Sequence, residues 1–248
     1  MAAREGRIHS FQSLGGADGP GLRYVVFMQG CLLRCLYCHN PDAWEPEAGE
    51  SCAPEAVVEK IRRCRNYLGE KSGVTVSGGE PLLQWEFVEE LFRLLQKEGF
   101  HTALDTSGQG DIRGAERVLR RTDLVLCDLK FASEQEYRQY TGGSLRATLD
   151  FLRLTEKMRV PLWLRHVVVP GLTATAEQVL AIGRLASEFQ NIEKIELLPF
   201  KNICAVKYKA MNLSFPLADT PAMKRAELEN LQRIANQALR SAGPIWYT

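Results

Sequence analysis

The sequence predicts an α/β fold in which six strand–helix units form an open, partial (β/α)6 barrel. Apolar runs of strand length alternate with amphipathic stretches of helix length along the 248-residue chain. The runs are too uniformly apolar for an antiparallel sheet with one face in water, so parallel, buried strands are expected. Six units are fewer than the eight of a closed barrel. Because no linker or low-complexity tract interrupts the pattern, a single domain is expected over residues 1–248.

The predicted strands are short apolar runs bounded by polar or glycine residues. The first, "LRYVVFM" (22–28), leads straight into a loop rich in cysteine, and "GVTVS" (73–77) is the second. The remaining strands are expected at 101–105, 123–130, 161–169 and 194–200.

The predicted helices repeat apolar residues at helical spacing. The first, "PEAVVEKIRRCRNYL", covers 54–68, and the second, at 86–99, ends on a glycine. Further helices are expected at 112–122, within 133–158 and at 175–189. The last, near 220–241, places these apolar residues roughly on one face: Met223, Leu228, Leu231, Ile234 and Leu239.

Composition excludes several classes of function. A formal net charge of +1 gives no reason to expect nucleic-acid binding or a polybasic membrane anchor. The start of the chain, "MAAREGRIHS", has no apolar run, and no segment approaches the length of a membrane span, so a cytoplasmic protein is expected. An odd number of cysteines, seven, disfavours a disulfide scaffold. Four of them are scattered and are expected as small buried hydrophobes, with Cys52 more exposed in a loop.

Unusual polar residues follow the predicted strands at their carboxyl ends. They are the cysteine loop after the first strand, "SGGEP" (77–81), "DTSG" (105–108), "DLK" (128–130), Arg165 in the fifth strand and "PFK" (199–201). In parallel α/β sheets these ends meet at one rim, where ligands bind. The sequence therefore predicts one functional site assembled from all six units.

The loop "GCLLRCLYCHN" (30–40) carries Cys31, Cys35 and Cys38. A structural zinc site closes with four ligands, usually in two CxxC-like pairs, and no second pair exists downstream. A zinc site that borrows Cys52 or His39 remains an alternative. An iron–sulfur cube fits better, because thiolates are its normal ligands and three of them leave one iron open. The fourth ligand is then expected to be a substrate or cofactor.

Three other features point to ligand chemistry. Glycines in "VTVSGGEP" let a ligand approach the backbone closely, although a plain glycine turn is the simpler alternative. Asp105 and Asp128 end adjacent strands, and two carboxylates close together need a cation or basic group between them. Arg165 lies between apolar residues, and a buried arginine needs an anionic partner, either a ligand or a structural salt bridge.

The spacing CxxxCxxC, with Tyr37 before the third cysteine, resembles the signature of radical S-adenosylmethionine (SAM) enzymes. The resemblance continues through "GRIHSFQSLGGADGPGLRYVVFMQGCLLRCLYCHNPD", "VTVSGGEPLLQ", "HTALDTSG", "DLVLCDLK", "LRHVVVPG" and "KIELLPF" to the glycyl-radical-enzyme activases. It implies that Cys31, Cys35 and Cys38 hold a [4Fe–4S] cluster whose open iron binds SAM, and that a 5′-deoxyadenosyl radical results.

The resemblance also implies roles for residues along the rim. Lys130 is expected to face the SAM carboxylate, and Lys130 and Arg165 are the expected catalytic residues. A monovalent cation, Na⁺ or K⁺, is expected between Asp105, Thr106, Asp128 and the carbonyl of Leu126. The expected cofactor-binding residues are Tyr37, Asn40, Ser77, Gly78, Gly79, Glu80, Asp105, Thr106, Asp128, Lys130, Arg165, Val167, Leu198 and Lys201. Lys201 stands where close relatives carry histidine. For several of these residues, core packing, capping or surface charge is the alternative.

The implied substrate is a backbone glycine of a glycyl radical enzyme, with pyruvate formate-lyase as the expected partner and flavodoxin or ferredoxin as electron donor. Cys52 and Cys64 are too few for the additional clusters that some activases carry after the first loop. Asp18, in the turn "DGPG" (18–21), is a candidate partner contact, and a monomer is expected. The alternatives are an activase of another glycyl radical enzyme, a radical SAM enzyme acting on a small molecule, and a non-catalytic iron–sulfur or zinc protein.

Overall fold

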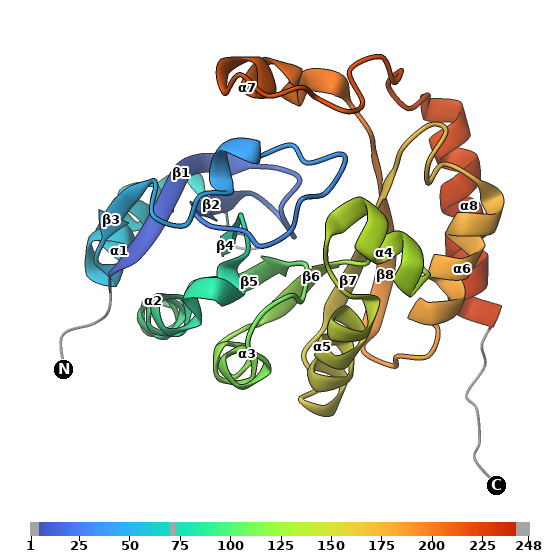
Figure 1. The fold of residues 1–248 in the computed structure, drawn as a ribbon. Helices are drawn as coiled ribbons and strands as arrows, with labels where there is room; N and C mark the ends of the chain where they lie inside the picture. The colour runs from blue at the N-terminus through green and yellow to red at the C-terminus, as the bar shows by residue number, and fades with distance from the viewer. Residues whose placement is uncertain (1–4, 70–72, 242–248) are drawn as a thin grey trace, which may run out of the picture.

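A single curved sheet of eight strands organises the chain (Figure 1). The computed structural model describes residues 5–69 and 73–241. The sheet order is β3-β1-β2-β4-β5-β6-β7-β8, and every pair from β2 to β8 is parallel. The strands are β1 (Gly6–Gly15), β2 (Arg23–Met28), β3 (Glu50–Cys52), β4 (Gly73–Gly78), β5 (His101–Thr106), β6 (Leu124–Asp128), β7 (Leu162–Val168) and β8 (Ile192–Pro199).

The six predicted strands are confirmed as the parallel, open part of the sheet, but the prediction missed two antiparallel strands. β1 pairs with β2, and the short β3 pairs with β1 at the edge. β1 mixes polar and apolar residues because only part of it is covered, so it lacks the uniform apolar run of a buried strand. The expectation that Cys52 is exposed was wrong: it ends β3 and is 6% exposed.

The helices lie close to their predicted positions, with two breaks. The segment predicted as one helix over 54–68 ends at Arg62 and continues as a short 3-10 turn. The helical region 133–158 divides at Gly142, which takes a left-handed conformation. The helices are α1 (Pro54–Arg62), α2 (Trp85–Lys97), α3 (Ile112–Leu119), α4 (Glu134–Thr141), α5 (Leu145–Lys157), α6 (Ala176–Ala186), α7 (Ala205–Ala210) and α8 (Arg225–Ser241).

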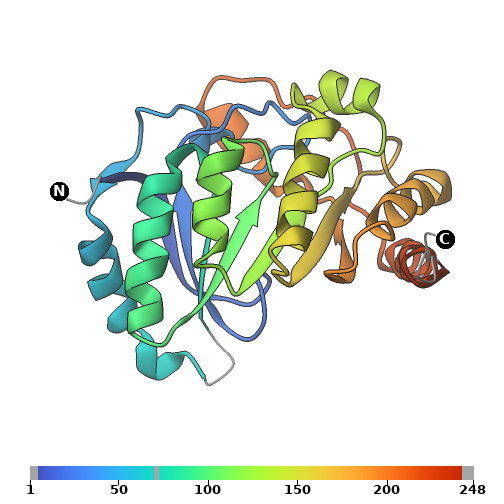
Figure 2. The same cartoon turned by 90° about the horizontal axis from the view of Figure 1, so that it is seen from below.

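The helices cover the convex side of the sheet and leave the concave side to the loops. Figure 2 shows α2, α3 and α5 side by side across the outer face, with α6 and α8 beyond them. The short helix α7, which was not predicted, lies on the opposite side (Figure 1). Among the described residues, no helix combines the length and apolar character needed to cross a membrane.

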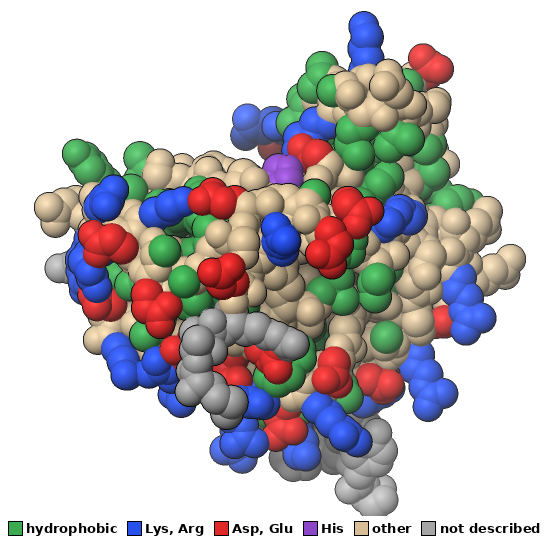
Figure 3. Space-filling view, turned by 60° about the vertical axis from the view of Figure 1, so that its left-hand side comes forward, with side chains coloured by type: hydrophobic (Ala, Val, Ile, Leu, Met, Phe, Trp, Pro, Cys, Tyr) green, Lys and Arg blue, Asp and Glu red, His purple; other side chains and the backbone are tan. Residues whose placement is uncertain are grey.

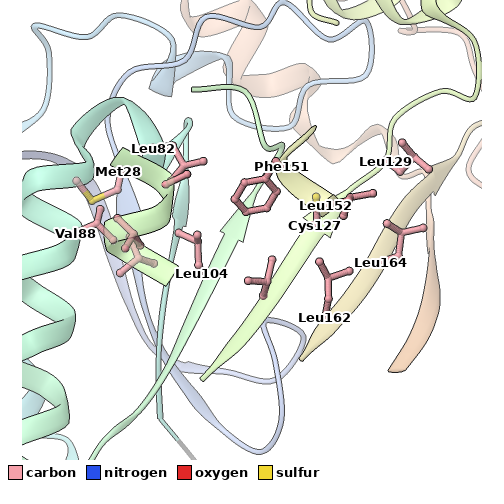
Figure 4. Close-up of a cluster of buried hydrophobic side chains, with 14 of the residues drawn as sticks. Met28, Leu82, Val88, Leu104, Cys127, Leu129, Phe151, Leu152, Leu162 and Leu164 are labelled. Atoms are coloured by element: carbon pink, nitrogen blue, oxygen red, sulfur yellow. The ribbon is translucent and has the colours of Figure 1, made fainter. Parts of the chain in front are cut away.

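The hydrophobic core lies between the sheet and its helices (Figure 4). Leu104, Cys127 and Leu164 point toward this layer from neighbouring strands and pack with Phe151 and Leu152 of α5. Each fully buried aliphatic side chain of this kind contributes about 2 kcal/mol. Side chains alternate along a strand, so the residue after each of these three points to the concave face.

Those next residues are Asp105, Asp128 and Arg165. Packing of the core therefore places three charged side chains together on the concave face. This is the rim that the sequence predicts as the functional site.

Candidate cofactor site

A cavity of about 460 Å³ opens on the concave face at the carboxyl ends of the strands. Most predicted site residues line it: Asp18, Cys31, Cys35, Tyr37, Cys38, Asn40, Ser77, Gly78, Gly79, Asp105, Thr106, Asp128, Lys130, Val167, Leu198 and Lys201. Glu80, Leu126 and Arg165 are not among the lining residues. The structure thus brings the residues of six separate units to one place.

The cysteine loop is braced on both sides. Following β2, the amide of Gly30 donates to the carbonyl of Ala43 at 2.8 Å, and that of Cys31 donates to Trp44 at 3.2 Å. Farther along, the amide of Arg34 donates to the carbonyl of Thr141 at the end of α4, at 2.8 Å. The loop is therefore positioned by its own backbone contacts.

All three cysteines line the cavity, and none of them forms a disulfide. Burial raises the pKa of Cys31 and Cys35 to about 11, and burial also raises that of Cys38. Thiols that resist ionisation in this apolar setting become thiolates when a metal centre supplies positive charge. Among the described residues, no three His, Cys, Asp or Glu side chains are grouped tightly enough to hold one metal ion.

Gly78, the last residue of β4, and Gly79 hold that strand against the cysteine loop. The amide of Gly79 donates to Met28 at 2.9 Å, and the amide of Glu80 donates to Gly30 at 2.8 Å. Gly78 has a positive φ of 109°, and a Cβ there would lie 2.3 Å from the nitrogen of Met28. A Cβ on Gly79 would lie 2.1 Å from the carbonyl oxygen of Gly30. Any larger residue would therefore push the segment away from the loop.

Glu80 lies beneath the cavity, where its side chain contacts other groups of the protein. Its side chain is 1% exposed and accepts hydrogen bonds from the amide of Ser107 at 2.9 Å and the amide of Leu82 at 3.1 Å. The hydroxyls of Ser107 and Thr106 also donate to it. Burial raises the pKa of Glu80, and the hydrogen bonds from Ser107 and Thr106 oppose that rise. Glu80 therefore fixes the turn after β5, and its predicted contact with SAM remains a prediction.

Two carboxylates meet basic groups at the cavity wall. Asp105 lies within β5 and accepts a hydrogen bond from the Ser77 hydroxyl at 2.7 Å. The following helix α3 is capped by Asp111, so Asp105 is not a helix cap. Burial raises the pKa of Asp105 to about 6; the Arg165 cation opposes the rise and the Asp128 carboxylate adds to it. Lys130 Nζ lies 2.9 Å from Asp128 Oδ2. Burial disfavours the charged lysine, but Asp128 outweighs burial and raises the pKa of Lys130.

Arg165 lies behind the cavity wall, 4% exposed, with three partners. Its Nε donates to Glu196 at 3.1 Å, one terminal nitrogen lies 3.5 Å from Asp105, and the other donates to the carbonyl of Ala17 at 2.5 Å. The structure therefore contains the structural salt bridge that was one of the two expected partners of Arg165. A direct role for Arg165 toward SAM stays a prediction. The side chain of Leu126 is fully buried on the concave face of the sheet, where it belongs to a small cluster with Ala103.

Apolar groups complete the wall. Tyr37 is buried, with its hydroxyl 3.5 Å from the carbonyl of Lys130, and Val167 and Leu198 lie on the β7–β8 side. The cavity is also lined by His39, which the sequence offered only as an alternative zinc ligand, and by residues that were not predicted as site residues: Phe27, Leu33, Trp44, Ser107, Pro199 and Ile203. His39 and Ser107 each adjoin predicted site residues in their motifs, and this position in the sequence could have identified them as lining residues. Ile203 lies two residues after the predicted Lys201, in a segment without a recognisable motif, so its own position in the cavity lining could not be identified from sequence.

The fold and the cavity define a class of protein. Residues 25–181 match the family model of the radical SAM superfamily, a span that includes all three cysteines. The fold resembles that of Streptococcus suis SuiB bound to precursor peptide SuiA, with a TM-score of 0.69 and 12% identity, over 88% of this chain and 45% of that chain. The chain belongs to the radical SAM superfamily, as its cysteine motif predicts.

Curated relatives narrow the class further. The pyruvate formate-lyase-activating enzyme of Clostridium pasteurianum is 42% identical over 235 residues, covering 94% of this chain and 98% of the relative. The enzyme of the same name from Staphylococcus aureus (strain USA300) is 39% identical over 240 residues, covering 94% and 96%. The chain belongs to the family of pyruvate formate-lyase-activating enzymes, which confirms the resemblance to glycyl-radical-enzyme activases.

The residues present fit the cofactors of this superfamily, a [4Fe–4S] cluster and SAM. Three thiols on one braced loop face a cavity whose lining includes no other cysteine. The opposite wall offers bare glycine backbone, a lysine and short oxygen donors, which suit the polar end of an amino acid. An apolar side between Tyr37, Val167 and Leu198 suits a flat ring.

Proposed function

We propose that this protein activates pyruvate formate-lyase by generating a radical on a backbone glycine of that enzyme. The single observation that carries the proposal is the meeting of Cys31, Cys35 and Cys38 with Gly78, Gly79 and Lys130 in one cavity. The names of the relatives at 42% and 39% identity support the choice of partner. When bound, the cluster and SAM supply a 5′-deoxyadenosyl radical that removes a Cα hydrogen from glycine.

The side chains of this protein hold and orient SAM. Lys130, kept charged by Asp128, is proposed to bind the SAM carboxylate, and the backbone of Ser77, Gly78 and Gly79 its amino group. Tyr37, Val167 and Leu198 contact the adenine. Asn40, Glu80, Thr106, Arg165 and Lys201 complete the proposed set of residues at or behind the cofactor.

A monovalent cation, Na⁺ or K⁺, is proposed beside SAM between Asp105, Thr106, Asp128 and the Leu126 carbonyl. The support is the closeness of two carboxylates, of which Asp105 has a pKa raised to about 6, first by burial and in part by Asp128. A cation would relieve that repulsion.

Asp18 is proposed to contact the glycine-bearing loop of the partner, since it lines the cavity from the turn that precedes β2. A flavodoxin or ferredoxin is proposed as electron donor. We also propose that residues 1–248 act as one radical SAM core domain, as a monomer in the cytoplasm.

The test is spectroscopic. The protein is reconstituted anaerobically with iron and sulfide, reduced, and examined by EPR with and without SAM. We expect a [4Fe–4S]⁺ signal that changes on adding SAM, and a glycyl radical signal once pyruvate formate-lyase is present. A cluster that ignores SAM would contradict the proposal, and zinc in place of a cluster would refute it outright.

Cysteine variants test which thiols hold the cluster, and one of them serves as the matched control. Cys31→Ala, Cys35→Ala and Cys38→Ala should each lose the cluster signal, because each removes one of three thiolate ligands. Cys64→Ala, at a partly buried cysteine outside the cavity lining, should retain it. A SAM-responsive signal with no glycyl radical would show that the partner is a different molecule.

A further inference from the structure

The segment after β8 carries an exposed surface that is continuous with the cavity. We call Lys201, Ile203, Val206 and Lys209 the rim patch. Lys201 and Ile203 both line the cavity and are exposed, Ile203 by 69%. Val206, one turn farther on in α7, is 72% exposed. The rim patch therefore extends from the cavity wall onto the outer surface.

Exposed apolar residues gather on this segment. Nine large hydrophobic residues of the described part of the chain are exposed, and four of them lie within residues 203–213. The four are Ile203, Val206, Met211 and Leu213. Figure 3 shows hydrophobic side chains together with charged side chains of both signs on the projection at the top of the molecule, where Figure 1 places α7. Clustering of this kind marks interaction surfaces, whereas single exposed apolar residues are ordinary.

Contacts beneath α7 hold the rim patch in place. Lys207 Nζ lies 3.1 Å from Asp42 Oδ1 and donates to Asn40 Oδ1 at 2.9 Å. The Tyr208 hydroxyl donates to the carbonyl of Cys38 at 3.3 Å, and its ring packs 4.7 Å from that of Phe215. The inner face of α7 is thus fixed to the cysteine loop, and the outer face is left for another molecule.

The charge of the segment is one-sided. Residues 200–218 contain three lysines and no carboxylate. Lys207 is paired with Asp42, whereas Lys201 and Lys209 have no carboxylate partner among the described residues. Two unpaired cations beside apolar side chains favour a partner face that combines apolar residues with carboxylates.

We propose that the rim patch is the docking surface for the polypeptide that carries the reacting glycine, and that this polypeptide presents apolar and acidic side chains to it. The inference rests on the proposed function. A backbone glycine reaches the cavity only if the residues on either side of it cross the rim, and Lys201 and Ile203 are exposed cavity-lining residues on that rim. An electron carrier does not need to enter the cavity, which is why the substrate polypeptide is the favoured occupant.

The test changes the part of the rim patch that lies outside the cavity lining. The double variant Val206→Glu, Lys209→Glu introduces like charge toward an acidic partner and removes an apolar contact. Binding of purified, non-radical pyruvate formate-lyase to reconstituted, SAM-loaded protein is measured at low and high salt. We expect the Kd to rise at least tenfold at low salt, and its salt dependence to weaken.

The matched control is the double variant Ile112→Glu, Arg113→Glu. Ile112 is 45% exposed and Arg113 is exposed at the start of α3, on the convex side away from α7 (Figure 1). This control should change the Kd less than twofold. Iron content and the SAM-induced EPR change should be equal in both variants and the unaltered protein, which excludes misfolding as the cause.

Each other outcome counts against the proposal. An unchanged Kd in the rim variant would overturn it, as would retained pyruvate formate-lyase binding with lost flavodoxin binding, which would assign the surface to the electron donor. An unchanged Kd in the rim variant, with normal binding by the unaltered protein, would refute the docking surface alone, whereas failure of the unaltered protein to bind pyruvate formate-lyase despite a normal EPR response to SAM would refute the proposed partner. Absence of that EPR response would refute the proposed function instead.

Discussion

The guanidinium of Arg165 donates a hydrogen bond to the backbone carbonyl of Ala17 at 2.5 Å. This bond joins the fifth parallel strand to the turn that precedes the first, across most of the concave face. Ala17 immediately precedes Asp18, which lines the cavity. Arg165 also contacts Glu196 and Asp105, so one side chain positions both a cavity carboxylate and the turn. Its effect on the site is therefore expected to operate through these neighbours.

Arg165→Lys should loosen the turn at residues 17–21. A lysine keeps the charge but donates from one point, so it cannot serve Glu196, Asp105 and Ala17 together. We expect amide hydrogen exchange in this turn to accelerate at least tenfold, with a loss of about 2 kcal/mol in unfolding free energy. Exchange measured by mass spectrometry checks this, with Arg113→Lys as an exposed control. Unchanged exchange at 17–21 would show that the turn is held by other contacts.

Glu80→Gln should destabilise the fold although it replaces only one carboxylate oxygen with an amide nitrogen. The carboxylate accepts from two groups of Ser107 as well as from Thr106 and Leu82, and an amide nitrogen would face one of these donors. We expect a loss of about 2 kcal/mol in urea unfolding of the cluster-free protein. Glu116→Gln, at a half-exposed pair with Arg120, should cost less than about 0.5 kcal/mol. Equal losses in the two variants would contradict a structural role specific to Glu80.

Gly78→Ala should be more damaging than Gly171→Ala. Both glycines have positive φ, but a Cβ at Gly171 meets nothing within 4 Å, whereas one at Gly78 meets the Met28 backbone at 2.3 Å. Gly171→Ala should cost about 1 kcal/mol through strain alone. Gly78→Ala should cost about 3 kcal/mol, because overpacking adds to strain. Iron bound after reconstitution should fall only in the Gly78 variant, and similar iron content in both would refute the coupling of this glycine to the cysteine loop.

Stability should fall in mild acid because of His166. This histidine is 1% exposed, and burial lowers its pKa from 6.5 to about 4. Between these two pH values the unfolded chain binds a proton that the folded protein does not, so stability present above pH 6.5 is lost as pH falls toward 4. The full effect is about 3 kcal/mol.

His166→Gln provides the comparison, since it cannot titrate but can still donate to the Leu129 carbonyl that lies 2.8 Å from Nδ1. Urea unfolding of both proteins is measured from pH 7 to pH 4. The unaltered protein should lose more stability across this window than the variant. Parallel curves would rule out His166 as the source of acid sensitivity.

Much of the fold and of the site could be predicted from sequence. The six parallel strands are uniformly apolar because both faces are covered, and such runs are visible without any structure. Residues that end those strands must share one rim, so the meeting of Cys31, Gly78, Asp105 and Lys130 followed from their positions in the chain. β1 escaped prediction because a half-covered edge strand has a mixed pattern.

The sequence by itself determined which chemical groups stand at the rim and, through strand alternation, which face they occupy. Only the tertiary structure decided what each group touches. Glu80 turns to Ser107 and Thr106, Arg165 reaches back to Ala17, and Ile203 lines the cavity from the segment after β8. The physical reason is that periodic burial is a local property of the chain, whereas the partners of a buried polar group lie far away in sequence and are chosen by packing.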